Sequence, residues 1–439
     1  MNRIAQELND TLKEKSKVFY EMLSDFGRNI YMPKGILSQG DEAKKKAFKY
    51  NATLGVAIEG GSPMYLSSVF DHFDNMDPFE TFTYAPPMGL PGLRSKWKDK
   101  MIEENPSIGG LENISLPVVT SGLTHGISIA ADLFAEEGDE IIIPEQMWGN
   151  YRLIYEVKHK AKIINYPLFD DSLSGLNING LEDAIAQTKK DKITLLFNFP
   201  NNPTGYTPSL EEEKKLVDLI EKYAERGKKI LVISDDSYYG LLFKEGHSTE
   251  TIFSKCIGLH KNICTIKLDG FTKEFYAWGF RVGFITFGDF GGNSESFRAL
   301  ERKVSGTIRS TLSSCSKPAQ SILEKVLTEG RYKQEKADKF IIMKERAEKV
   351  RQVVYDDKYK DCWEVYPFNS GYFMCIRLKG VNSNELRLFA LDKYGIGTIS
   401  LGEKNLRIAY SSIEKEDISD IFETLSKAIR EYKSTTIHK

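Results

Sequence analysis

ITLLFNFPNNPTG, residues 193 to 205, joins an apolar run to a turn that contains three asparagines and two prolines. A short apolar run bounded by turn residues is typical of a strand that is buried on both faces of a sheet. In open α/β sheets, ligands bind beyond the carboxyl ends of the strands. We therefore interpret this polar turn as part of a candidate ligand-binding edge.

Six further short apolar runs recur along the chain and alternate with amphipathic stretches. This alternation predicts an α/β fold, in which a large domain holds a mainly parallel seven-stranded sheet covered by helices. The predicted strands are residues 116–119, 140–143, 163–166, 193–197, 230–233, 263–266 and 282–285. Two of the predicted helices are residues 125–134 and 210–223, and Ser209 is a suitable N-cap for the second.

A smaller α+β domain, built from both termini, is predicted outside the sheet. Charged, helix-like sequence at residues 324–354 leads to an apolar run at 371–376 and to a final helix at 414–432. We divide the chain into three segments and expect the first and third to share the smaller domain. These segments are residues 1–64, 65–325 and 326–439.

The first segment begins with an amphipathic pattern. Ile4, Leu8 and Leu12 recur at four-residue spacing, which predicts a helix with one apolar stripe. The stripe has two possible partners, because such an arm can pack on its own domain or on a neighbouring subunit.

Composition narrows the class of partner. The chain has 60 Lys and Arg against 62 Asp and Glu, so no basic field favours nucleic acid or an anionic membrane. No run approaches the roughly 20 apolar residues of a membrane helix, and the N-terminus lacks the apolar core of a signal peptide. The five cysteines are odd in number and show no CxxC spacing, which indicates reduced, mostly core residues and neither a disulfide framework nor a zinc site. We expect a cytoplasmic protein that binds small molecules.

Chemically active residue types follow several of the predicted strands. Taken singly, each has an ordinary explanation as a helix start, a core aromatic, a helix cap or a surface lysine. The turn at residues 120–124 opens a helix whose free N–H groups could hold a phosphate. The others, in chain order, are Trp148, Asp235, Tyr238, Lys273 and Arg281.

Together these pieces resemble the class I/II pyridoxal-phosphate-dependent aminotransferases of fold type I, the aspartate aminotransferase superfamily. The resemblance extends over roughly residues 50 to 430. Its most specific part is the Asn-Asn-Pro-Thr-Gly turn, followed by Asp235-x-x-Tyr238 at 33 residues after Asn202. Lys273 comes 38 residues after Asp235, and Arg281 comes eight residues after Lys273.

The resemblance implies pyridoxal 5'-phosphate as the cofactor of the large domain. It assigns Asn202 and Tyr238 to the phenolic oxygen and Asp235 to the pyridine nitrogen, where a carboxylate keeps the ring protonated as an electron sink. Lys273 would form the resting Schiff base and carry the proton during turnover. Trp148 matches the aromatic residue that stacks on the ring.

The resemblance also assigns a set of groups to the cofactor's phosphate. These are Arg281, the backbone N–H groups around Gly122 and Leu123, the Thr124 hydroxyl and, across a dimer interface, Tyr84.

The chain departs from the family at one phosphate-binding position. The family often has a serine three residues before the lysine, where this chain has Gly270. The change removes one hydrogen bond, worth about 1 kcal/mol, unless Thr272 or a backbone group replaces it.

The resemblance also implies three residues that recognise the substrate. Arg407 is similar to the arginine that binds the substrate's α-carboxylate as a planar fork. Gly55 matches a glycine whose backbone approaches that carboxylate, although an ordinary turn glycine explains it equally well. Arg309 stands where aspartate-type members carry an arginine that pairs with a distal carboxylate of the partner's substrate, or it serves the subunit interface.

The resemblance thus implies a homodimeric aminotransferase that moves an amino group from an L-amino acid to a 2-oxo acid by a ping-pong mechanism. Dicarboxylic and aromatic substrates both stay open. Two alternatives remain, namely another reaction of the same cofactor, such as β-elimination by a C–S lyase or decarboxylation, and a non-catalytic regulator that binds the cofactor.

Overall fold

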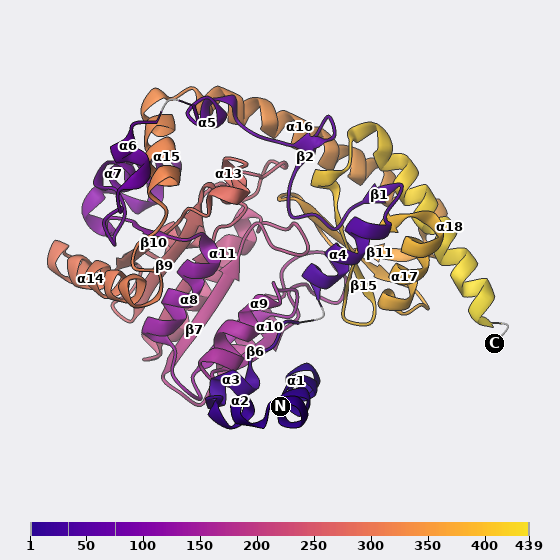
Figure 1. The fold of residues 1–439 in the computed structure, drawn as a ribbon, viewed down its shortest axis with the longest axis horizontal. Coiled ribbons are helices and arrows are strands. Elements are labelled where there is room, and N and C mark those ends of the chain that lie inside the picture. Colours follow the sequence, from indigo (N-terminus) through magenta and orange to yellow (C-terminus); the bar gives the residue numbers. More distant parts are fainter. Residues whose placement is uncertain (1, 34, 75, 438–439) are drawn as a thin grey trace.

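The computed structural model describes residues 2–33, 35–74 and 76–437 (Figure 1). A seven-stranded sheet forms the centre of its larger part, in which β10 is antiparallel to both of its neighbours and the other six strands run in one direction. This confirms the predicted fold class. Across the sheet the strands are β4 (Val118–Thr120), β10 (Gly283–Asp289), β9 (Ile263–Gly270), β8 (Lys229–Asp235), β7 (Lys192–Asn198), β5 (Glu140–Pro144) and β6 (Lys162–Tyr166).

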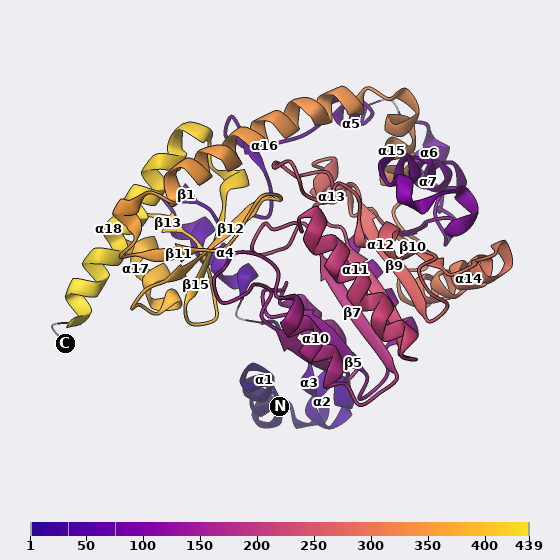
Figure 2. The same ribbon diagram turned by 180° about the vertical axis from the view of Figure 1, so that it is seen from behind.

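Both faces of this sheet are covered by helices. Leu195 and Phe197 of β7 pack into a core with α10 (Ile178–Ala186), α11 (Leu210–Glu225) and α12 (Ile252–Cys256). Figure 2 shows α10 and α11 lying across this face. Leu196, which points the opposite way, belongs to the core that includes α8 (Leu123–Phe134). Burial on both sides explains why the strands are near-continuous apolar runs.

The helix α11 begins at the N-cap that the sequence predicts. Ser209 accepts a hydrogen bond from the backbone N–H of Glu212, and the Glu212 side chain accepts one from the N–H of Ser209. This reciprocal pair satisfies two N–H groups that the first turn leaves open, so the predicted N-cap is confirmed.

The smaller part contains a second sheet and segments from both ends of the chain. Its strand order is β11 (Trp363–Val365), β12 (Phe373–Leu378), β15 (Asn405–Ala409) and β14 (Ile399–Leu401). The helices α17 (Ser383–Tyr394) and α18 (Ile418–Ile437) pack against each other. From the N-terminal side, α4 (Ile36–Lys46) contacts β14, and β1 (Tyr50–Asn51) pairs with β13 (Ile396–Gly397).

Two helices replace the single charged stretch predicted at residues 324–354. α15 (Lys317–Glu329) ends at Gly330, whose φ of 75° is the left-handed conformation typical of a helix C-terminus. α16 (Tyr332–Val354) then runs from the larger part to the smaller one (Figure 1). The predicted boundary after residue 325 lies within α15, and the division into three segments stays a prediction.

The predicted apolar stripe of the first helix is only partly buried, since Ile4 and Leu12 are half-buried. Ala5 and Asn9 of the first helix are buried, whereas Leu8 is 51% exposed. The arm consists of α1 (Arg3–Lys15), α2 (Lys17–Met22) and α3 (Asp25–Asn29), and α3 packs on the helical segment Leu153–Lys158 near the edge strand β6. Among the described residues, no helix combines the length and apolar character needed to cross a membrane.

Four of the five cysteines are buried and Cys264 is exposed, and all five are free thiols as predicted. The remaining elements are short or peripheral. They are β2 (Ile58–Glu59), β3 (Ser62–Pro63), α5 (Ser67–Phe70), α6 (Pro78–Phe82), α7 (Pro91–Glu104), α9 (Asn150–Arg152), α13 (Phe271–Glu274) and α14 (Ser294–Thr311).

Candidate active site

A cavity of about 420 Å³ opens at the carboxyl ends of β7, β8 and β9. It is bounded by residues of both sheets, because Phe373 and Arg407 come from the smaller part. The structure brings ten residues from the sequence analysis to its wall. They are Gly55, Leu123, Thr124, Trp148, Asn202, Asp235, Tyr238, Lys273, Arg281 and Arg407.

Two asparagines of the polar turn after β7 stabilise the turn, and the third lines the cavity. Asn198 accepts a hydrogen bond from the N–H of Asn202 at 2.8 Å and donates one to the backbone oxygen of Asp235 at 2.8 Å. Asn201 accepts from Thr204 and donates to the backbone oxygen of Gln146. These two amides therefore hold the turn together, and Asn202 presents its side chain to Arg407 across the cavity.

Asp235 is buried at the end of β8 with three donors around its carboxylate. The Tyr151 hydroxyl donates to Oδ2 at 2.6 Å, and the Ser237 hydroxyl and N–H donate to Oδ1 at 2.5 and 3.2 Å. Such donors stabilise an ionised carboxylate and fix its orientation. Sequence reasoning missed both partners, although Tyr151 lies three residues after Trp148 and Ser237 two after Asp235.

Lys273 lies on α13, just beyond the end of β9. Its Nζ is 5.1 Å from the centroid of the Tyr238 ring. Burial, opposed by the negative charge of Asp235 and assisted by the positive charge of Arg281, lowers the pKa of Lys273 to about 8. A lysine with this pKa is partly neutral near pH 7, so it can act as a nucleophile and a base.

An anion cradle lies beside Lys273, where α8 begins without a side-chain cap. The φ of Gly122 is 76°, and a Cβ on this residue would lie 2.4 Å from Nη2 of Arg281. The guanidinium therefore packs directly on the start of the helix, where free N–H groups and the helix dipole favour a phosphate.

Thr272 adds a hydroxyl to this end of the cavity. Its Oγ1 is buried and has no hydrogen-bond partner among the described residues. An unpartnered buried hydroxyl has a cost unless a ligand satisfies it. The cradle of Gly122, Arg281 and Thr272 thus fits the phosphate of the implied cofactor despite the glycine at position 270.

Arg407 extends from β15 into the opposite end of the cavity. Nη1 donates to Oδ1 of Asn202 at 3.2 Å, Nη2 donates to the backbone oxygen of Thr53 at 3.1 Å, and the guanidinium lies 4.1 Å from the Phe373 ring centroid. Burial lowers the pKa of Arg407. Within the described part of the chain its partners include no carboxylate, so this buried cation is suited to an anionic ligand.

Two predicted residues lie away from the cavity in the single chain. Tyr84 is 89% exposed, and Arg309 lies on the exposed side of α14, where it donates to the Ser313 hydroxyl. Both were expected to act across a subunit boundary, which a single chain does not test, so their roles stay predictions. Gly55 does line the cavity, and a Cβ on it would meet nothing within 4 Å.

The N-terminal side of the chain contributes a wall that sequence reasoning missed. Ile36, Gly40, Asp41 and Lys44 of α4 line the cavity. The segment has no motif that indicates a ligand, and only the pairing of the N-terminal segment with the smaller part brings it to the site.

Comparison with known proteins finds aminotransferases among both the curated relatives and the solved structures. The chain is 27% identical over 207 residues to a probable aspartate aminotransferase of Methanocaldococcus jannaschii, a match that covers 47% of this chain and 49% of that one. The chain thus spans about half the length of the first curated relatives it matches. A longer match, 23% identical, covers 98% of the chain and 94% of an aromatic amino acid aminotransferase of Dictyostelium discoideum.

Solved structures extend the likeness to most of the fold. An aminotransferase from Anaerococcus prevotii is 25% identical with a TM-score of 0.82, covering 93% of this chain and 99% of that one. A Pyrococcus horikoshii kynurenine aminotransferase, solved with pyridoxamine phosphate, shares the fold at 15% identity, with a TM-score of 0.76 and coverage of 95% and 98%. The family profile described as aminotransferase class I and II matches residues 77–425. The chain therefore belongs to the class I and II aminotransferases, a family that depends on pyridoxal phosphate.

Proposed function

We propose that this protein transfers the amino group of an L-amino acid to a 2-oxo acid, with pyridoxal phosphate as the carrier. The observation that carries the proposal is the convergence of Lys273, Asp235 and Arg407 on one cavity. These are a buried amine with a lowered pKa, an oriented carboxylate and a buried guanidinium without a carboxylate partner in the described chain. Each supplies one requirement of amino transfer, namely proton movement, ring protonation and substrate binding.

Different residues of the cavity would hold the phosphate and the phenolic oxygen of the cofactor. The N-terminus of α8, Arg281 and Thr272 would hold the phosphate. Tyr238 and Asn202 would contact the phenolic oxygen, because both line the cavity between Lys273 and Arg407. Burial raises the pKa of Tyr238, which keeps its hydroxyl protonated as a hydrogen-bond donor.

Catalysis would then depend on how these side chains place the substrate. Pyridoxal phosphate, when bound, stores the electron pair released at the substrate's α-carbon. Arg407 would bind the α-carboxylate and thereby orient the α-hydrogen toward Lys273. The Lys273 amine would remove that proton and deliver it to the cofactor's aldehyde-derived carbon, and it would carry a proton in the opposite direction in the second half-reaction. Asp235, held by Tyr151 and Ser237, would stabilise the protonated ring nitrogen.

The cavity wall supports an aromatic or other apolar side chain on the amino donor. Its apolar lining includes Ile36, Leu54, Trp148, Trp278 and Phe373. The Dictyostelium relative that matches nearly the whole chain is named an aromatic amino acid aminotransferase, whereas several shorter matches are named aspartate aminotransferases. Dicarboxylic donors would need a further cation, and Arg309 of a second subunit would supply it.

We also propose that the protein acts as a homodimer. Support comes from large aromatic side chains that the single chain leaves open around α6, since Phe79, Phe82 and Tyr84 are 77%, 85% and 89% exposed. Contiguous exposed apolar groups of this size usually mark an interface. A second copy over this surface would bury them and bring Tyr84 toward the partner's cofactor.

The function is tested with purified protein that has been supplied with pyridoxal phosphate. The protein is mixed with phenylalanine, tyrosine, aspartate, glutamate or alanine, and the visible spectrum and the products are recorded. Conversion of the cofactor to its aminated form with release of the matching 2-oxo acid supports the proposal and names the donor class. Release of ammonia or carbon dioxide in place of the 2-oxo acid would instead indicate elimination or decarboxylation.

A further inference from the structure

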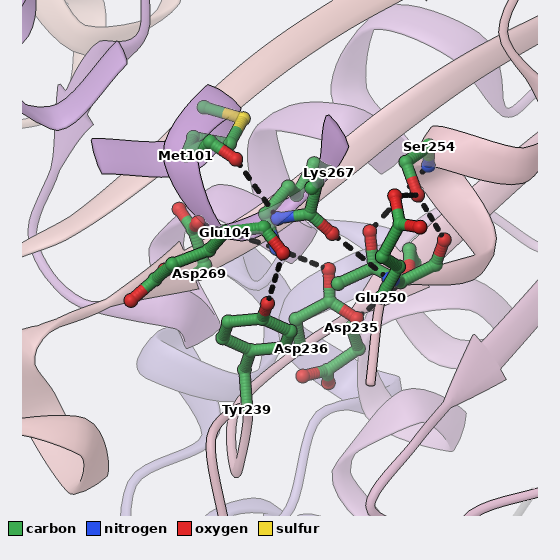
Figure 3. Close-up of polar contacts among 12 residues, drawn as sticks. Met101, Glu104, Asp235, Asp236, Tyr239, Glu250, Ser254, Lys267 and Asp269 are labelled. Carbon is green, nitrogen blue, oxygen red and sulfur yellow. Dashed lines mark hydrogen bonds and ion pairs between the residues drawn. The ribbon is translucent and has the colours of Figure 1, made fainter. Parts of the chain in front are cut away.

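A buried cluster of three charged residues lies next to the cofactor-facing ends of β8 and β9. Nζ of Lys267 is 2.5 Å from Oδ2 of Asp236 and 3.3 Å from Oδ2 of Asp269. The Lys267 and Asp236 side chains are only 1% and 2% exposed, and that of Asp269 is 6% exposed. Figure 3 shows the three side chains together, with Asp235 next to Asp236. None of the three lines the cavity described above.

Neighbouring elements add further hydrogen bonds to the two carboxylates of the cluster. The Ser234 hydroxyl donates to Oδ1 of Asp236 at 2.7 Å, and Nε1 of Trp97 in α7 donates to Oδ1 of Asp269 at 3.0 Å. The ammonium of Lys267 also lies 4.9 Å from the centroid of the Tyr239 ring. Groups held by this many partners have one arrangement, so the cluster fixes the backbone segments that carry it.

Those segments are the two that carry the proposed reaction centre. Asp236 directly follows Asp235, and Asp269 lies four residues before Lys273. β8 and β9 are parallel neighbours, with Asp235 opposite Leu268 in their register. Lys267 therefore connects the end of the strand that presents the carboxylate to the end of the strand that leads into the lysine.

Stability alone is a poor explanation for such a cluster. Burying two carboxylates and an ammonium has a desolvation cost that their attraction often fails to exceed, and apolar residues of similar volume are frequently as stable or more so. Burial alone would lower the pKa of Lys267, but Asp236 and Asp269 raise it above its usual value, so the ammonium is retained. Because burial of this ionic cluster has a high desolvation cost, we infer that the cluster serves to fix the geometry of the site.

We propose that Lys267 is a positioning residue, which holds the Asp235 carboxylate and the Lys273 amine at a fixed separation by clamping Asp236 to Asp269. The inference rests on the proposed function, because it concerns how the two groups meet pyridoxal phosphate. A displacement of about 1 Å between reacting groups can cost two orders of magnitude in rate. The clamp acts on orientation and leaves the substrate-binding Arg407 untouched.

The test compares Asp236→Asn, Asp269→Asn and Lys267→Met with the parent holoenzyme. Asp236→Asn keeps a polar side chain for Ser234 and leaves Lys267 paired with Asp269, so it is the variant that best preserves the fold. Lys192→Met is the matched control, because it removes an ion pair with Asp139 at the amino end of β7 in the same sheet. Each variant is measured for kcat, KM, melting temperature and the visible circular dichroism of the bound cofactor, which reports the orientation of its ring.

The clamp predicts a changed visible dichroism and about a tenfold lower kcat in Asp236→Asn, with KM within about twofold of the parent, because orientation and not substrate binding is lost. Lys192→Met should have the same visible dichroism and the same kcat as the parent protein. If Lys267→Met does not fold, the two Asp→Asn variants decide the matter. Folded variants with parental dichroism and kcat, and only a lower melting temperature, would overturn the inference. Failure of the parent protein to bind pyridoxal phosphate would instead count against the proposed function.

Discussion

The Tyr151 hydroxyl donates a 2.6 Å hydrogen bond to Oδ2 of Asp235, and both side chains are buried. The bond joins the segment that follows β5 to the end of β8, two strands that are separated in the sheet by β7. It orients the carboxylate toward the cavity, and burial together with the negative charge of Asp235 raises the pKa of Tyr151 so that its proton stays in place.

Tyr151→Phe removes this donor and keeps the ring. A hydrogen bond of this kind contributes about 1 kcal/mol, and more when one partner is charged, so kcat should fall by about five- to tenfold. The dissociation constant of pyridoxal phosphate should change much less, because the phosphate cradle is intact. Steady-state kinetics and a cofactor titration measure the two effects, and an unchanged kcat would show that Ser237 alone orients Asp235.

Attachment of the cofactor should depend on pH through Lys273. Only the neutral amine reacts with the cofactor's aldehyde, and burial lowers the pKa of this amine to about 8 in the cofactor-free protein. The attachment rate, followed by visible absorbance, should therefore rise about tenfold per pH unit below 8 and level off above it. A rate that keeps rising through pH 10 would mean that the lysine has its ordinary pKa.

Thr272→Val tests the hydroxyl that has no partner in the described chain. If this hydroxyl donates to the phosphate, its loss should weaken cofactor binding by about 1 kcal/mol, or roughly fivefold. Thr286→Val is the control, because the Thr286 hydroxyl is also buried and unpartnered among the described residues but lies within β10 and does not line the cavity. Equal affinities for both variants would assign the phosphate to Arg281 and the backbone.

Arg407→Lys keeps a cation and loses the planar fork. Two parallel hydrogen bonds to a carboxylate need the guanidinium geometry, so KM for every amino acid should rise by about ten- to a hundredfold. The visible spectrum without substrate should stay that of the parent protein. A loss confined to one amino acid would show that Arg407 binds a side chain and not the common α-carboxylate.

The sequence predicted the seven strands because each is an apolar run buried on both faces, as Leu195 and Leu196 show from opposite sides of β7. The sequence also predicted residues that the fold brings to one cavity, since Asp235, Lys273 and Arg407 all line it, and their roles in catalysis stay predictions. The break between α15 and α16 was missed, because a single glycine at position 330 does not stand out within a charged helical pattern.

The partners of the site residues were harder to predict. No local motif in the sequence indicates the partners of Tyr151 or Lys267, because these partners depend on which strands become neighbours. The α4 wall likewise arises from pairing between residues about 345 positions apart, such as Tyr50 with Ile396. Residues that act through contacts distant in sequence leave no local pattern.

The proposed amino transfer is tested most directly by following the amino group itself. The protein with bound pyridoxal phosphate is given a ¹⁵N-labelled amino acid and an unlabelled 2-oxo acid, and the products are analysed by mass spectrometry alongside Lys273→Ala. We expect ¹⁵N in the amino acid formed from the 2-oxo acid, and we expect Lys273→Ala to form none of this product. Release of the label as ammonia, or transfer that persists in Lys273→Ala, would contradict the proposal.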